Sequence, residues 1–249
     1  MERAVTLDQG RRSVMQDKLL VADNFFAPGN LLGIVCDGHS DEGEAVAQTI
    51  VREIPKVLGL KLGQKIEIKR ALIETFAQVS GIINYENSGA TVLAFLCDGL
   101  KVYFANAGDC RLIVIGNNYV QQLTNDHRLE CGAEKQRVLA LGAHLSGSYV
   151  CLGDGSYGLM PTRTFGDRRL NSVGIISEPE VGCYELLDTD EYLIAATDGL
   201  YDELSNNEIK NYLYGTRINS DFTQSLIGLG KIDMWGMSDN KAIIGLKFK

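Results

Sequence analysis

Two stretches of the chain place apolar side chains every three or four positions, which is the spacing of an amphipathic helix. They are residues 42–58 and residues 65–85. The stretch 59–63 between them begins and ends with glycine and predicts a turn, so the two helices should pair antiparallel. Shorter helices are expected at 132–141 and 205–214, and the second opens on Ser205 and Glu208, the pattern of a capping box.

Other segments are short and continuously apolar, which is typical of buried strands. Residues 90–96 and 101–107 flank Asp98-Gly99, and this dipeptide predicts a hairpin. Gly116-Asn117-Asn118 predicts a second hairpin between strands at 111–115 and 119–123. Further strands are expected at 18–23, 31–36, 174–177, 181–187, 191–196 and 242–248.

The order of these elements predicts the fold class. A (β/α)₈ barrel needs strands and helices in strict alternation, whereas here strands follow one another in hairpins and helices come in blocks. This order favours an α+β architecture. The number of strands favours two packed antiparallel β-sheets over one open sheet. We expect residues 1–249 to form a single domain.

Composition narrows the classes of function. The formal net charge of −8 argues against a nucleic-acid partner. The chain has no apolar run of about 18 residues and no apolar segment at its N-terminus, so we expect no membrane insertion and a cytoplasmic location, with the nucleus also compatible. The six cysteines never form C-x-x-C, which argues against a zinc site. Buried free thiols are favoured over disulfides.

Acidic residues recur where predicted strands end. Residues 31–36 and 192–197 each run into an Asp-Gly pair, Asp37-Gly38 and Asp198-Gly199. Such a pair ordinarily makes a turn, but His39 follows the first at once, and Asp17, Asp109 and Asp239 also adjoin predicted strands. Clustered carboxylates repel one another unless cations neutralise them. With only three histidines in the chain, oxygen ligands and hard ions such as Mg²⁺, Mn²⁺ or Ca²⁺ are expected.

Eight motifs occur in an order that resembles one known family. They are 10-GRRSVMQD-17, 35-VCDGH-39, 88-SGAT-91, 105-ANAGDCR-111, 123-LTNDH-127, 162-TRTFGD-167, 197-TDGLYD-202 and 238-SDN-240. Together they resemble the metal-dependent Ser/Thr protein phosphatases of the PP2C type (the PPM family) over nearly the whole chain. The resemblance implies an α-β-β-α sandwich with antiparallel helix pairs on both sides of the sheets.

The resemblance also implies a phosphatase that acts on phosphoserine and phosphothreonine by direct attack of a water or hydroxide that bridges two Mg²⁺ or Mn²⁺ ions. Asp37 would bridge the ions, Asp198 and Asp239 would complete one of them, and the backbone carbonyl of Gly38 would bind the other. Asp17 would help to hold metal-bound water. The expected substrates are phosphorylated proteins, and the catalytic domain is expected to be monomeric.

Two further roles follow from the same resemblance. Arg12 matches the phosphate-binding arginine, and a guanidinium suits two phosphate oxygens. His39 matches the proposed general acid, although a purely structural role for it stays open. Asp109 and Asp202 match residues linked to a weaker third metal ion, with buried hydrogen-bonding roles as the alternative.

Some residues depart from the family pattern or invite a plainer interpretation. Gln16 stands where many relatives have Glu, and it brings no charge to the metal site. Arg163 and Asp167 are interpreted as a structural ion pair, and Asp126-His127 as a turn. Two other functions stay open: a pseudophosphatase serving as a regulatory binding module, and a phosphatase of small phosphorylated molecules.

Overall fold

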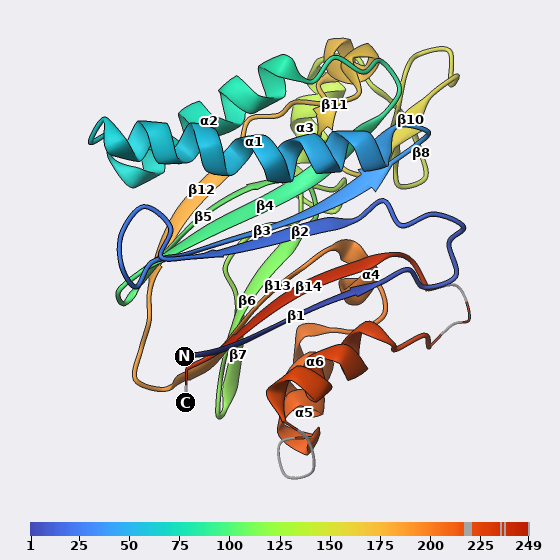
Figure 1. The fold of residues 1–249 in the computed structure, drawn as a ribbon. Coiled ribbons are helices and arrows are strands. Elements are labelled where there is room, and N and C mark those ends of the chain that lie inside the picture. Colours follow the sequence, from blue (N-terminus) through green and yellow to red (C-terminus); the bar gives the residue numbers. More distant parts are fainter. Residues whose placement is uncertain (217–220, 235, 237, 249) are drawn as a thin grey trace.

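A computed structural model describes residues 1–216, 221–234, 236 and 238–248. Two β-sheets lie face to face, and each carries helices on its outer side (Figure 1). The strand pairs within these sheets are antiparallel. The predicted α+β class with two packed antiparallel sheets is confirmed.

The first sheet has six strands. Five follow the order β12-β5-β4-β3-β2, and the short strand β11 pairs with β4. Their bounds are Lys18–Asp23 (β2), Leu31–His39 (β3), Gly89–Asp98 (β4), Lys101–Ala107 (β5), Phe165–Gly166 (β11) and Glu180–Glu185 (β12).

The second sheet has five strands in the order β1-β14-β13-β6-β7. Their bounds are Glu2–Asp8 (β1), Arg111–Gly116 (β6), Tyr119–Gln122 (β7), Asp190–Ala196 (β13) and Lys241–Lys247 (β14). A small separate sheet holds His144–Ser146 (β8), Tyr149–Cys151 (β9) and Gly158–Leu159 (β10).

Two helix pairs cover the outer faces of the sheets. Helices α1 (Gly43–Gly63) and α2 (Ile68–Ile82) pack on the first sheet, and α5 (Asn206–Thr216) and α6 (Phe222–Gly230) pack on the second. The remaining helices are α3 (Gly132–Ala140), the short α4 (Asp198–Tyr201) and a 3₁₀ helix (Arg168–Val173). The predicted capping box is confirmed, since the Ser205 backbone N–H donates to Glu208 Oε2 at 2.8 Å and the Glu208 N–H donates to Ser205 Oγ at 3.3 Å.

The layered core explains why the strands are continuously apolar. In β3, Leu32 and Ile34 face α1 and α2, whereas Leu31 and Val35 face the second sheet. Because successive side chains point to opposite faces, a strand buried on both faces needs apolar residues at nearly every position. The same packing carries Asp37 inward, because β3 extends past Cys36 to His39.

The structure corrects three predictions of local structure. Residues 59–63 continue α1 instead of forming a turn, because Leu62 extends the buried spacing of Ile54 and Leu58 by one more helical turn. Residues 174–177 form only an isolated bridge between Ile176 and Arg163, since Gly174 (φ +94°) redirects the chain after the 3₁₀ helix. Cys183 is exposed, although the six cysteines are free as expected.

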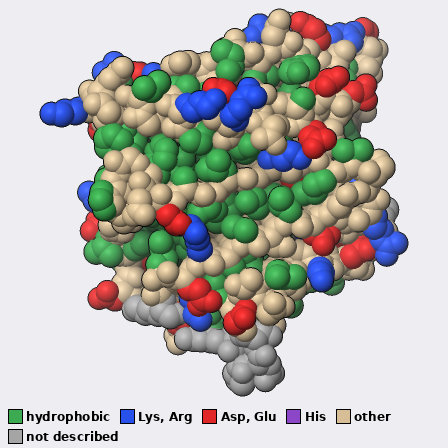
Figure 2. Space-filling model, in the orientation of Figure 1, with side chains coloured by type: hydrophobic (Ala, Val, Ile, Leu, Met, Phe, Trp, Pro, Cys, Tyr) green, Lys and Arg blue, Asp and Glu red, His purple; other side chains and the backbone are tan. Residues whose placement is uncertain are grey.

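The sequence patterns also missed some elements. Strand β1 lies at the edge of its sheet and buries only Ala4, so it shows no apolar period. Helix α6 and the small sheet were not predicted either. On the face drawn in Figure 2, basic and acidic side chains are interspersed and form no large patch of one sign. Within the described ranges, the structure has no helix with the length and apolar character needed to cross a membrane.

Candidate metal centre

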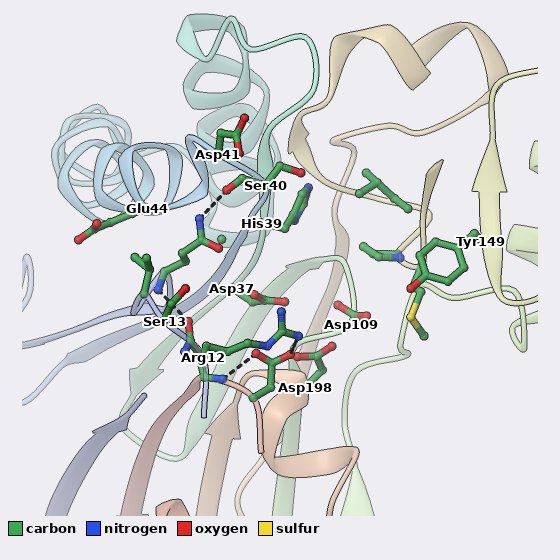
Figure 3. A pocket seen from close by; sticks show the side chains of 18 residues that line it. Arg12, Ser13, Asp37, His39, Ser40, Asp41, Glu44, Asp109, Tyr149 and Asp198 are labelled. Atoms are coloured by element: carbon green, nitrogen blue, oxygen red, sulfur yellow. Dashed lines mark hydrogen bonds and ion pairs between the residues drawn. The ribbon is translucent and has the colours of Figure 1, made fainter. Parts of the chain in front are cut away.

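Three carboxylates converge where the ends of the two sheets meet. Asp37 lies in β3, Asp109 lies between β5 and β6, and Asp198 is the first residue of α4. Each offers an oxygen that lies within 4.8 Å of the oxygens offered by the other two. Figure 3 shows these side chains close together, with Arg12 and His39 on different sides of them.

A cavity of about 500 Å³ opens above these carboxylates. Most of the residues predicted for the site line it, namely Arg12, Asp37, Gly38, His39, Asp109, Asp198 and Asp239. Asp17 is buried next to it and accepts a hydrogen bond from the Thr197 hydroxyl at 2.7 Å. Asp202 is at the edge, with a side chain that is 53% exposed. The fold therefore gathers the predicted residues in one region.

Glycine at position 38 permits the close packing that builds one wall. A Cβ on Gly38 would lie 2.4 Å from the Gly43 carbonyl oxygen at the start of α1 and 2.9 Å from that of Gln16. Only a residue without a side chain allows three backbone segments to approach so closely. The Gln16 side chain supports the same packing by donating to the Ser40 carbonyl at 2.6 Å.

The acids of the centre perturb one another strongly. Burial raises the pKa of Asp37, and the neighbouring carboxylates of Asp17, Asp109 and Asp239 raise it further. Burial likewise raises the pKa of Asp198, with Asp37 the next largest cause. The pKa of Asp17 rises to about 8, mainly by burial. A nearby cation would favour the charged forms of these groups, so the cluster has the electrostatics of a cation site.

The donor set fits a hard divalent ion. The centre offers carboxylate oxygens, which Mg²⁺ and Mn²⁺ prefer. Two of these atoms, Asp17 Oδ1 and Asp109 Oδ1, are buried and have no hydrogen-bond partner among the described residues. Because an unpaired buried carboxylate oxygen is costly, a metal ion or a metal-bound water is its natural partner.

Arg12 and Asp239 contact each other at the mouth of the cavity. Arg12 Nη2 donates to Asp239 Oδ2 at 2.5 Å, and the arginine side chain is 62% exposed. The second oxygen, Asp239 Oδ1, accepts from the Asn240 backbone N–H at 2.7 Å. The guanidinium thus reaches the acidic cluster while remaining accessible from solvent.

His39 is held by a buried carboxylate that the sequence analysis assigned elsewhere. Its Nε2 lies 2.7 Å from Asp167 Oδ2, so the predicted ion pair between Asp167 and Arg163 is wrong. Arg163 instead binds the buried Glu134, at 2.7 Å from its Nη2 to Oε1. Asp167 also accepts hydrogen bonds from the hydroxyls of Thr164 and Tyr157. These contacts fix the orientation of the carboxylate that faces His39.

A glycine also explains how two distant motifs meet at Asp167. Gly89 opens β4 and pairs with Gly166 of β11. A Cβ on Gly89 would lie 2.0 Å from Asp167 Oδ2, so the missing side chain leaves room for the carboxylate. Asp167 itself adopts φ +46°, a conformation that Asp tolerates better than most residues.

Arg128 is the residue near the centre that sequence reasoning missed. Its guanidinium contacts three acids, through Nε to Asp109 at 2.6 Å, Nη2 to Asp198 at 2.7 Å and Nη1 to Asp202 at 2.9 Å. The only signal in the sequence is its place directly after the Asp126-His127 motif. That motif is more than a turn, because Asp126 pairs with Arg111 and the buried His127 ring contacts the backbone of Gly108.

Comparisons with known proteins agree with the motifs. A family model described as "Protein phosphatase 2C" matches residues 3–212. "Probable protein phosphatase 2C 41" of Arabidopsis thaliana is 28% identical over 253 residues, which cover 86% of this chain and 71% of that protein. "Probable protein phosphatase 2C 13" of the same plant is 28% identical over 268 residues, which cover 95% and 68%.

Solved structures share the fold at low sequence identity. The serine-threonine phosphatase 2C of Toxoplasma gondii superposes with a TM-score of 0.85 at 18% identity, covering 99% of this chain and 94% of that one. The serine/threonine phosphatase of S. agalactiae gives a TM-score of 0.72 at 22% identity, with 100% and 99% covered. These likenesses support the sandwich architecture.

Proposed function

Because the chain belongs to the protein phosphatase 2C family of metal-dependent Ser/Thr phosphatases, we propose that it hydrolyses phosphoserine and phosphothreonine in proteins at a centre of two Mg²⁺ or Mn²⁺ ions. One observation carries the proposal: Asp37, Asp109 and Asp198 converge in a cavity that Arg12 and His39 also line. When bound, two divalent ions would activate water as the nucleophile and neutralise charge on the phosphoryl group.

The acids would divide the binding of the ions among them. Asp37 is central because the carboxylates of Asp17, Asp109 and Asp239 raise its pKa and Asp37 in turn raises that of Asp198, so it suits the bridging position. Asp198 and Asp239 would complete one ion and the carbonyl of Gly38 would bind the other. Asp17 is buried and would act indirectly, by holding a water molecule in place. The uncharged side chain of Gln16 donates to the Ser40 carbonyl in the wall and brings no charge.

Arg12 would bind the phosphate of the substrate. Its exposed guanidinium lies at the cavity mouth and carries five N–H donors, which can bind two phosphate oxygens at once. An ion on Asp239 would weaken the hold of that carboxylate on Arg12, since both cations draw on the same charge. Phosphate would then become the stronger partner of the arginine.

His39 would protonate the serine or threonine oxygen as it leaves. The hydrogen bond between Nε2 and Asp167 fixes the ring, so the other nitrogen, Nδ1, is the one left to donate the proton. Asp167 is a positioning residue in this scheme, because it acts on the substrate only through His39. A histidine fixed by a buried carboxylate is a recurrent arrangement in acid–base catalysis.

One wall of the cavity suits a peptide substrate. Tyr149, Leu159, Met160 and Pro161 line the cavity, and Figure 3 shows Tyr149 on the side away from Glu44. An apolar wall beside a phosphate site can contact side chains that flank a phosphorylated residue. This feature favours phosphoproteins over small phosphorylated molecules.

The test is metal-dependent hydrolysis of a phosphopeptide and of an aryl phosphate. We expect turnover with Mn²⁺ or Mg²⁺, loss of it in EDTA, and a loss of at least about a thousandfold in Asp37→Asn. Asp98→Asn, at the far end of the neighbouring strand β4, is the matched control and should retain wild-type rates. Phosphopeptide binding without turnover in the metal-loaded wild type would instead identify a pseudophosphatase.

A further inference from the structure

The Arg128 guanidinium lies among three carboxylates and would compete there with any third divalent ion. Asp109 and Asp202 are the residues that the family resemblance links to such an ion, and both contact the Arg128 guanidinium. The same group reaches Asp198, so three carboxylates share one fixed positive charge. A metal ion and a guanidinium cannot both sit among these oxygens at contact distance.

Arg128 is fixed by its own backbone and by burial. Its side chain is only 17% exposed. The His127 backbone N–H donates to the Gly108 carbonyl at 3.0 Å, which anchors the segment beside Asp109. The Cys131 N–H donates to the Arg128 carbonyl at 3.0 Å. These two hydrogen bonds hold the backbone of Arg128 next to the acids that its side chain contacts.

The two oxygens of Asp109 are used differently. Oδ2 accepts from Arg128 Nε at 2.6 Å, while the buried Oδ1 has no hydrogen-bond partner within the part of the chain that the structure describes. The arginine therefore orients the carboxylate so that one oxygen remains for the group that Asp37 and Asp198 would bind. Arg128 thus separates an outer position, which it fills itself, from an inner position open to metal.

Charge balance supports the same division. Asp17, Asp37, Asp109, Asp198, Asp202 and Asp239 bring six negative charges when ionised. Arg12 and Arg128 bring two positive charges, and two divalent ions would bring four more, which makes this set of eight side chains neutral. A third divalent ion would leave it with an excess of positive charge.

We propose that Arg128 is a built-in cation that replaces the third metal ion and limits the centre to two divalent ions. This inference rests on the proposed function, since it assumes that the inner acids bind metal. A merely structural role for Arg128 would not change the number of ions that the protein binds, whereas this proposal predicts that number.

The experiment counts Mn²⁺ ions without measuring catalysis. Chelator-stripped protein is titrated with Mn²⁺ by calorimetry and by equilibrium dialysis, in the wild type, Arg128→Met, Arg128→Lys and Arg111→Met. Arg111 is the matched control because its side chain is also 17% exposed and pairs with a carboxylate, that of Asp126. We expect the wild type, Arg128→Lys and Arg111→Met each to bind two Mn²⁺ ions. Arg128→Met should bind a third ion at least tenfold more tightly than the wild type binds any third ion.

Asp202→Asn gives a test that does not depend on the folding of an Arg128 variant. If Arg128 fills the outer position, loss of this exposed carboxylate leaves the number of bound Mn²⁺ ions unchanged. Three results would each overturn this inference without touching the proposed function. The wild type could bind a third Mn²⁺ ion at submillimolar concentration, Asp202→Asn could lose such an ion, or the wild type and Arg128→Met could give identical titrations. No Mn²⁺ binding by the wild type would overturn the proposed metal centre as well.

Discussion

His127 should make this protein sensitive to mild acid. Its side chain is buried, and burial is the main cause that lowers its pKa from 6.5 to about 4, with the positive charge of Arg163 as the second cause. The Gly108 backbone N–H lies 3.1 Å from Nδ1, a contact that the neutral ring can accept. The folded protein therefore holds this imidazole in its neutral form at pH values where an exposed histidine is charged.

The sign and size of the effect follow from proton linkage. Between pH 4 and pH 6.5 the unfolded chain binds more protons at this histidine than the folded chain does, so stability falls as the pH falls through that window. Taking 6.5 for the unfolded and about 4 for the folded pKa, the shift from pH 7 to pH 5 costs about 2 kcal/mol. This part of the folding stability is then lost at pH values above those at which ordinary carboxylates titrate.

The assay compares urea unfolding of the wild type and His127→Asn at pH 7 and pH 5, with EDTA present throughout. Asn keeps an acceptor for the Gly108 N–H but does not titrate. The wild type should lose about 2 kcal/mol more than the variant, or roughly 0.7 M in urea midpoint for a slope of about 3 kcal/mol/M. Equal losses in the two proteins would show that the acid sensitivity comes from groups other than His127.

Three further predictions concern the wall, the buried charges and the general acid. Gly38→Ala should lower the free energy of unfolding by about 2 kcal/mol or more, because its Cβ would lie 2.4 Å from the Gly43 carbonyl oxygen. The variant should also bind Mn²⁺ more weakly in calorimetry, and an unchanged affinity would contradict this prediction. Glu134→Gln should lower the free energy of unfolding in urea by about 3 kcal/mol, since it leaves two partly buried arginines without their carboxylate. A loss below about 1 kcal/mol would contradict this prediction. His39→Gln and, more weakly, Asp167→Asn should slow hydrolysis of a phosphoserine peptide about a hundredfold more than that of an aryl phosphate, whose leaving group needs no proton; equal losses on both substrates would remove the assignment.

Local patterns predicted much of the fold because burial imposes a period on the sequence. The hairpin at Asp98-Gly99 is confirmed: Asp98 pairs with Lys101, and Gly99 adopts the positive φ (+60°) that its turn requires. The prediction of strands failed where burial does not produce a regular spacing of apolar residues. Edge strand β1 buries one residue, and Ile175 owes its burial to a small cluster with Val138 and Leu170, not to pairing in a sheet.

Motifs of residues close together in the chain were enough to identify the family, the sandwich and the acids that line the cavity. Tertiary structure decided which charges meet. His39 and Asp167 are 128 positions apart, and Arg128 and Asp198 are 70 apart. Their pairing depends on how the ends of two sheets converge, and no local spacing records that. An arginine next to a turn motif thus acquires a role at the centre only through the packing that brings three carboxylates to it.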